Sequence, residues 1–282
     1  SYTVTVFVDG RRIAYRGALH RSRRPEEDMQ IKAALVDAVR NRQAVLFAGA
    51  GISWKAIGFG GAYIRDQLGM QIKRDYPDYD YGARSLEDVC DEYVALNDQI
   101  TLVDRLAALV PQDREPQESH LAAVKAFRFI VTTNWDLLFE AAYRKINQHY
   151  QVLSQDADAP MFNYDQHNLL KIHGSGDRPL SLVATTDDYE NYAETHARLL
   201  DKVAELLQNN TVLFVGYGLR DEHVRRLLSR IRGKRQQWTR KAYAVGFFDE
   251  VRTKLLASRQ IEVIRADADE FLSELAVQAG VT

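Results

Sequence analysis

Short runs of apolar residues alternate along most of the chain with segments whose apolar residues recur at helical spacing. The short runs are rich in Val, Ile, Leu and Phe, a composition typical of strands buried on both faces. We expect such strands within residues 44–53, 127–131, 169–173, 211–218, 241–247 and 261–266. We expect helices at residues 85–98, 99–110, 137–148, 187–210, 222–232 and 267–279. The alternation predicts an α/β fold in which helices cover both faces of a parallel sheet.

An N-terminal segment precedes this alternating pattern. Residues 4–15 hold two β-rich runs around Asp9-Gly10, which is a strong signal for a β-hairpin, and an arginine-rich stretch follows them. A helical pattern then begins. We therefore predict an N-terminal hairpin with an Arg-rich arm over residues 1–25, and a main domain over residues 26–282.

Within the main domain, residues 54–120 form an insertion between two predicted strands. Turn-forming and aromatic residues indicate that its first part is rich in loops: Gly58, Gly60, Gly61, Tyr76, Pro77, Tyr79 and Tyr81. The helices expected at 85–98 and 99–110 follow them. We predict a loop and helical insertion that forms a small module or a cover.

The charge of the chain is uneven although its formal net value is only −2. Residues 11–24 carry six arginines and no acidic residue, and residues 225–241 carry eight basic residues and no acidic residue. Such blocks can bind polyanions or an acidic protein face. For both blocks we favour a solvated helix flank or loop over direct binding of nucleic acid.

Cys90 is the single cysteine, which excludes an internal disulfide framework and a zinc site built from paired thiolates. No apolar run approaches the ~18–20 residues that cross a bilayer. The arginines near the N-terminus are not followed by the apolar stretch of a signal peptide. We expect a cytoplasmic protein that does not contact a membrane.

Polar or glycine-rich residues directly follow four of the predicted strands. In open parallel sheets, ligands bind beyond the carboxyl ends of the strands. The four strand ends are therefore expected to meet at one crevice. They are Gly49-Ala50-Gly51, Asn134 with Asp136, His173-Gly174, and Gly216-Tyr217-Gly218.

Two of these motifs are ambiguous when taken alone. The glycines of "GAGIS" (49–53) can bring the backbone close to a phosphate, or they can form a plain tight turn. The dinucleotide fingerprint GxGxxG is not completed, because Trp54 stands where its third glycine belongs. His173 in "KIHG" can be a structural histidine or a general base, while a metal site is disfavoured because no His or Cys stands at ligand spacing.

The stretch "TTNWD" (132–136) also has two interpretations. Its hydroxyl, amide and carboxylate side chains are all suited to capping the helix that follows. Alternatively, Asn134 holds a water molecule or a ribose hydroxyl beside Asp136, whose carboxylate accepts a hydrogen bond from a carboxamide. The order of the motifs along the chain favours the second interpretation for Asn134.

In this order and spacing, "GAGIS", "TTNWD" and "KIHG" resemble the sirtuin-like NAD-binding domain, and more closely its prokaryotic branch in anti-phage defence. The segments "LLKIHGS", "TTDDYENY", "LFVGYGLRDEHVRRLL" and "IEVIRADADEFL" are similar to the linking segments of that branch. The resemblance covers roughly residues 30–275 and leaves out the hairpin. It implies a Rossmann-like parallel sheet covered by helices on both faces.

Three departures from the family pattern narrow the resemblance. Deacylating sirtuins carry a four-cysteine zinc ribbon, which a chain with one cysteine cannot form. Thr133 replaces the glutamine of the deacylases, which favours the defence branch. Where that branch has Gly-Leu-Pro-x-Trp after the serine, this chain has residues 58–62, Gly-Phe-Gly-Gly-Ala, so its first loop is expected to contact ADP-ribose differently.

The resemblance implies that NAD⁺ is the substrate and that no metal is needed. It implies catalytic roles for Asn134, His173 and Asp136. Asn134 would orient a water or the nicotinamide-side ribose, Asp136 would contact the carboxamide or fix Asn134, and His173 would act as general base. It assigns binding of NAD⁺ to Gly49, Ala50, Gly51, Ser53, Thr133, Gly174, Gly216, Tyr217 and Gly218. Backbone donors of the first loop would hold the pyrophosphate, and Gly216 and Tyr217 would lie near the adenosine.

The function that the resemblance implies is an NAD⁺ glycohydrolase that depletes NAD⁺ during anti-phage defence. The alternative is a module that binds NAD or ADP-ribose and regulates a larger assembly without turnover. A protein deacylase is the third interpretation and is disfavoured. Relatives in defence systems also imply a homo-oligomer and a helicase-like ATPase or Argonaute-type partner, with the hairpin and the basic blocks as docking surfaces.

Overall fold

The computed structural model describes residues 2–8, 11–17, 31–217, 228–229 and 241–281. The chain divides into two compact units, Ser1–Gln30 and Ile31–Thr282. In the first unit, β1 (Tyr2–Val8) and β2 (Arg11–Gly17) pair antiparallel, which confirms the predicted hairpin. The boundary that we predicted after residue 25 lies outside the described residues.

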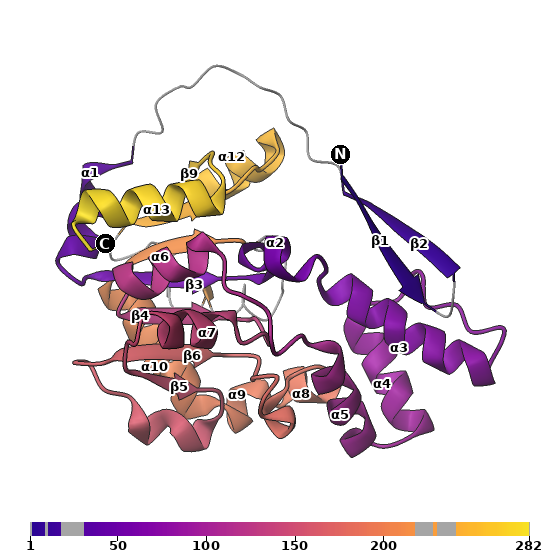
Figure 1. Ribbon diagram of the computed structural model, residues 1–282. Coiled ribbons are helices and arrows are strands. Elements are labelled where there is room, and N and C mark those ends of the chain that lie inside the picture. The colour runs from indigo at the N-terminus through magenta and orange to yellow at the C-terminus, as the bar shows by residue number, and fades with distance from the viewer. Residues whose placement is uncertain (1, 9–10, 18–30, 218–227, 230–240, 282) are drawn as a thin grey trace. The chain divides into compact units, whose positions relative to one another are not determined.

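The second unit is built on one sheet of seven parallel strands, as the sequence predicted (Figure 1). The strand order is β5-β6-β4-β3-β7-β8-β9. The strands are β3 (Ala44–Ala48), β4 (Phe129–Thr132), β5 (Tyr150–Leu153), β6 (His167–Lys171), β7 (Thr211–Val215), β8 (Ala242–Val245) and β9 (Ile261–Ile264). Sequence analysis missed β5, a four-residue edge strand in which only Leu153 is fully buried.

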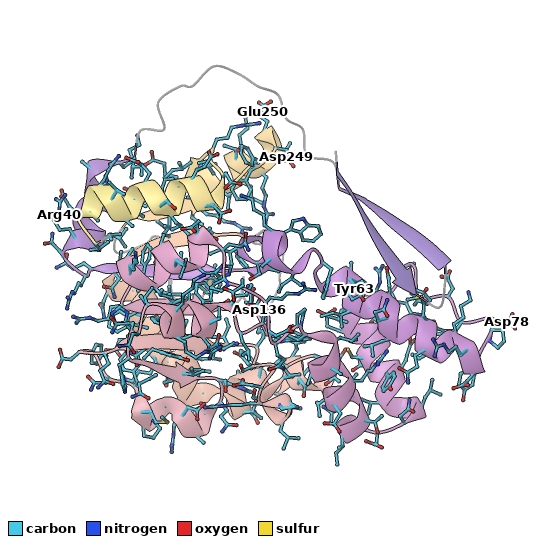
Figure 2. All side chains as sticks on the ribbon, in the orientation of Figure 1. Arg40, Tyr63, Asp78, Asp136, Asp249 and Glu250 are labelled. Atoms are coloured by element: carbon cyan, nitrogen blue, oxygen red, sulfur yellow. The ribbon has the colours of Figure 1, made fainter. Side chains whose placement is uncertain are left out.

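Helices cover the sheet, and side chains fill the space between them and the strands (Figure 2). Every residue of β3, β4 and β7 is buried, because both faces of these central strands are covered. The covering helices are α1 (Ala33–Arg40), α6 (Glu118–Ala126), α7 (Leu138–Lys145), α10 (Ala197–Asn209), α12 (Glu250–Ser258) and α13 (Ala268–Ala279). The apolar stripe of α10 shares one buried cluster with Val45 and Phe47 of β3.

The insertion is largely helical, with a loop between residues 76 and 85. It consists of α2 (Trp54–Ile57), α3 (Gly61–Asp75), α4 (Leu86–Leu96) and α5 (Gln99–Leu109), and the last three share a small core. Helix α3 was not predicted, whereas the loop expected around Tyr76, Pro77, Tyr79 and Tyr81 is present between α3 and α4. Gly58 ends α2, Gly60 begins α3, and Gly69 lies against the ring of Tyr81, so the glycines mark helix ends and a close contact.

One further helical prediction differs from the structure, one is largely untested, and two helices were not predicted. The long helix expected at 187–210 is broken into α8 (Thr186–Glu190), α9 (Tyr192–Thr195) and α10. The helix expected at 222–232 lies largely outside the described residues. Sequence analysis missed α6 and α12; in α12 only Leu256 is buried, so the apolar periodicity is weak.

Candidate active site

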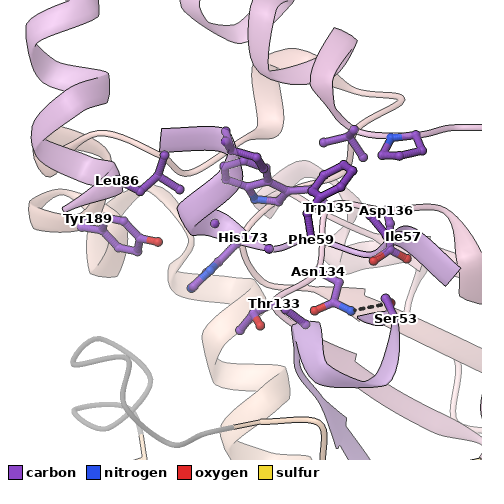
Figure 3. Close-up of a pocket in the computed structure, with 16 residues that line it drawn as sticks. Ser53, Ile57, Phe59, Leu86, Thr133, Asn134, Trp135, Asp136, His173 and Tyr189 are labelled. Atoms are coloured by element: carbon purple, nitrogen blue, oxygen red, sulfur yellow. Dashed lines mark hydrogen bonds between the residues drawn. The ribbon is translucent and has the colours of Figure 1, made fainter. Parts of the chain in front are cut away.

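A pocket of about 190 Å³ lies where the central strands end, and residues that follow β3, β4 and β6 face into it (Figure 3). The lining residues with polar side chains are Ser53, Thr133, Asn134, Asp136, His173 and Tyr189, and Ala50 lies beside them. The insertion adds Ile57, Phe59, Gly60, Gly61, Ile64, Leu86, Val110 and Pro111, and the turn after β4 adds Trp135. Asn134, Asp136 and His173 are thus brought together as predicted, and Trp135 also lines the pocket.

The amide of Asn134 is held in one orientation. Its Nδ2 donates to Ser53 Oγ at 3.0 Å and to the carbonyl oxygen of Gly49 at 3.3 Å. Since a carbonyl can only accept, the atom beside Gly49 must be the nitrogen. Oδ1 therefore points away from Ser53 (Figure 3), and it is buried with no hydrogen-bond partner among the described residues. A buried acceptor without a donor is costly, so this oxygen is suited to a water or hydroxyl in the pocket.

His120 in α6 forms a hydrogen bond with Ser53. This histidine was not among the residues predicted from the sequence. The backbone N–H of Gln117 donates to His120 Nδ1 at 3.3 Å, so the ring proton lies on Nε2. Nε2 then donates to Ser53 Oγ, also at 3.3 Å. Burial lowers the pKa of His120 to about 4, which keeps the ring neutral. The hydrogen bonds that His120 and Asn134 donate to Ser53 fix the amide whose oxygen faces the pocket.

His120 makes stability depend on pH. Below its ordinary pKa of 6.5 the unfolded histidine binds a proton, whereas the folded one stays neutral down to about pH 4. The free energy of unfolding should therefore fall by roughly 3 kcal/mol as the pH drops from 7 to 4. Urea unfolding of the wild type and of His120→Gln at pH 7 and pH 4 checks this. Only the wild type should show the part of the loss in unfolding free energy that comes from His120. The partly buried His167 and His196, whose pKa values are also lowered, are present in both proteins. Identical pH dependence of the two proteins would contradict the prediction.

Asp136 caps the following helix. Its Oδ1 accepts a hydrogen bond from the backbone N–H of Leu138, the first residue of α7, at 3.1 Å. The suggestion that Asp136 fixes Asn134 was therefore wrong, because Ser53 and Gly49 hold that amide. Asp136 is 7% exposed and lines the pocket, so contact with a bound carboxamide stays a prediction.

His173 lies two residues beyond β6 and is 5% exposed. The rings of Tyr189 and Tyr192 meet its ring edge-on, with centroid distances of 5.4 and 6.2 Å. Its side chain points into the pocket together with Tyr189, which sequence analysis did not single out (Figure 3). Gly174 makes the turn after it, with φ at +85° and space for a Cβ blocked at 2.1 Å by the carbonyl oxygen of Ser181.

The glycine loop after β3 is packed against the loop after β7. The N–H of Gly49 donates to the carbonyl of Val215 at 3.0 Å, and that of Gly51 to Gly216 at 2.8 Å. The N–H of Ser53 donates within the loop, to Ala50. These three donors are therefore already used within the chain. Ala50 lines the pocket, and binding of the pyrophosphate by this loop stays a prediction.

Gly216 and Tyr217 do not line the pocket. Gly216 has φ at +63°, and Tyr217 is buried with its ring centroid 5.2 Å from that of Phe47. Both lie against residues 49–52, so they shape the loop that carries Ser53. Gly218 lies outside the described residues.

Gly216 should tolerate no side chain. A Cβ there would lie 2.1 Å from the backbone nitrogen of Ile52, in a left-handed conformation. We expect Gly216→Ala to lower the free energy of unfolding by more than about 3 kcal/mol, measured by urea unfolding. Gly280→Ala is the matched control, because its φ is +71° with nothing within 4 Å, and should cost only about 1 kcal/mol. Equal costs would contradict the packing described for the two loops.

In the described part of the chain, no group of three or more His, Cys, Asp or Glu side chains could hold a metal ion. None of the helices described above is long and apolar enough to span a bilayer.

Comparison with known proteins points to one family. Residues 128–264 match the model of the SIR2-like domain. The chain is 23% identical over 221 residues to defense-associated sirtuin 2 of Bacillus subtilis, covering 70% of this chain and 20% of that protein. It is 26% identical over 231 residues to the NAD(+) hydrolase ThsA of Enterococcus faecium, covering 74% of this chain and 44% of that protein. It thus spans less than half the length of either relative.

The fold agrees with that match. The crystal structure of a SIR2 homolog–NAD complex superposes with a TM-score of 0.55 and 15% identity, covering 89% of this chain and 94% of that one. At that identity the likeness concerns the fold alone. Residues 128–264 are thus similar to the SIR2-like domain, and the fold of the chain is that of the solved SIR2 homolog.

Proposed function

We propose that the chain is an NAD⁺ glycohydrolase that cleaves NAD⁺ into nicotinamide and ADP-ribose. The observation that carries the proposal is the buried Asn134 Oδ1, which is fixed by Ser53 and faces the same pocket as His173. Similarity to proteins named NAD(+) hydrolase supports it. The pocket volume of about 190 Å³ is below the ~300–1,000 Å³ typical of whole-ligand pockets, so we assign it to the nicotinamide riboside end.

The proposed reaction asks little of the protein beyond position and a base. Nicotinamide is already cationic in NAD⁺, and the transition state resembles an oxocarbenium ion. The oxygen of water bonds to C1′ of the ribose, the C1′–N bond breaks, and its electron pair returns to the pyridinium ring. Asn134 Oδ1 accepts a hydrogen bond from that water or from a ribose hydroxyl, and His173 takes the proton.

Separation of products by chromatography tests this proposal. Incubation of the purified chain with NAD⁺ should release nicotinamide and ADP-ribose in equal amounts. The alternative, a module that binds NAD or ADP-ribose without turnover, would give binding in calorimetry and intact NAD⁺. An acetylated peptide should stay acetylated, because a single cysteine cannot build the zinc ribbon of the deacylases.

The biological role of the activity is a further part of the proposal. Similarity to a protein named defense-associated sirtuin supports a role in anti-phage defence. The homo-oligomer, the helicase-like or Argonaute-type partner, the cytoplasmic location and the docking role of the basic blocks stay predictions.

A further inference from the structure

A buried ion pair lies behind the pocket and has no part in the proposed chemistry. Lys171, the last residue of β6, is 1% exposed, and Glu140 in α7 is 4% exposed. Lys171 Nζ lies 2.8 Å from Glu140 Oε1. Lysine and glutamate are rarely buried to this extent unless they are paired.

Lys171 also binds the backbone of the turn that carries the candidate catalytic residues. Its Nζ donates to the carbonyl oxygen of Asp136 at 2.6 Å and to that of Trp135 at 3.4 Å. With the bond to Glu140, the ammonium has three acceptors for its three N–H groups. One side chain thus joins the end of β6, two residues before His173, to the turn that follows Asn134.

Stability alone does not explain this arrangement. Taking two charges out of water costs about as much as their attraction returns, and an apolar pair of the same volume is often as stable. What an apolar pair cannot do is hold two backbone carbonyls in place. Burial raises the pKa of the Glu140 carboxyl, and the Lys171 ammonium opposes that rise. The 2.8 Å contact makes Glu140 the acidic partner of the lysine.

We propose that Lys171, neutralised by Glu140, is a positioning residue that fixes the turn of residues 134–136 relative to the strand end carrying His173. The contacts of Lys171 keep Asn134 Oδ1 and His173 directed at one reacting centre. A misplacement of about 1 Å at such a centre can cost a hundredfold in rate. The catalytic part of this inference rests on the proposed hydrolase function.

The test replaces the whole pair. Lys171→Met alone leaves a buried carboxylate uncompensated, so Lys171→Met/Glu140→Met is the informative variant. Lys145→Met/Glu115→Met is the matched control, since it removes an exposed ion pair of 3.2 Å between Lys145, in the same helix as Glu140, and Glu115. Thermal melting measures whether each variant is folded. Calorimetry with carba-NAD⁺, an analogue that cannot be hydrolysed, measures how many binding sites each variant keeps.

We expect the buried-pair variant to melt within about 10 °C of the wild type, because the carbonyl of Asp136 loses its donor, and to bind carba-NAD⁺ with unchanged stoichiometry. Its kcat for NAD⁺ should fall about tenfold to a hundredfold with KM changed less than threefold. Backbone amides of residues 132–140 should exchange hydrogen at least about tenfold faster without substrate. The control should match the wild type in all of these measurements.

Wild-type kcat and wild-type exchange in a folded buried-pair variant would overturn the inference. Hydrogen exchange separates this failure from failure of the proposed function, because it needs no turnover. If the wild type leaves NAD⁺ intact, the hydrolase proposal fails, and the exchange rate of residues 132–140 still decides whether Lys171 holds the turn.

Discussion

Replacing Asn134 with alanine is expected to lower kcat for NAD⁺ cleavage by about a hundredfold to a thousandfold. The substitution removes the Oδ1 acceptor that faces the pocket, and loss of one preorganised polar group in an active site typically costs this much. Ser53 Oγ also loses a donor, but it keeps its bond to His120, so the fold should lose only about 1 kcal/mol. Steady-state kinetics and urea unfolding measure the two effects separately.

Asn134→Asp is the matched control for the orientation of the amide. It keeps an acceptor of the same size but places a second oxygen near the carbonyl of Gly49, where the wild type has the Nδ2 donor. The repulsion should turn the side chain, so we expect a kcat well below the wild type although an acceptor is present. Wild-type kcat in both variants would mean that Asn134 is only part of the helix start.

Replacing His173 with alanine is expected to have the second large effect, a fall in kcat of about a hundredfold to ten-thousandfold. The reason is the loss of the group that takes the proton from the attacking water. His173→Gln should be as inactive, because glutamine keeps a polar side chain of similar reach but cannot accept that proton. Calorimetry with carba-NAD⁺ should show binding in both variants within threefold of the wild type.

If His173→Gln retained wild-type kcat, the histidine would be a structural residue at the end of β6. Its buried position between Tyr189 and Tyr192 is compatible with that role, so the kinetic measurement is needed. Loss of carba-NAD⁺ binding together with kcat would instead assign His173 to substrate binding.

The sheet could be predicted from sequence because strands buried on both faces are continuous apolar runs, as in β3 and β7. The meeting of Asn134, Asp136 and His173 followed from the geometry of parallel strand ends. The edge strand β5 and helix α3 could not be found in this way. In both, contacts with distant residues decide the conformation, such as the ring of Tyr81 against Gly69.

The supporting residues of the site escaped sequence analysis for a similar reason. His120 holds Ser53 across 67 residues of sequence, and Lys171 holds Asp136 across 35. Neither stands in a motif whose spacing reveals its partner. The glycines of residues 49–51 were recognised, but their task is different: they let one backbone approach another at Gly216. A glycine pattern alone does not tell whether a ligand or a neighbouring loop comes close.

The central claim is that this pocket breaks the bond between nicotinamide and ribose. Proton NMR of NAD⁺ with the wild-type chain and with Asn134→Ala tests it directly, because substrate and both products are seen at once. Our mechanism predicts equal amounts of nicotinamide and ADP-ribose, in large molar excess over the wild-type chain, and at least about a hundredfold slower release with Asn134→Ala. NAD⁺ that stays intact with the wild-type chain while calorimetry shows it bound would contradict the mechanism and favour a binding module.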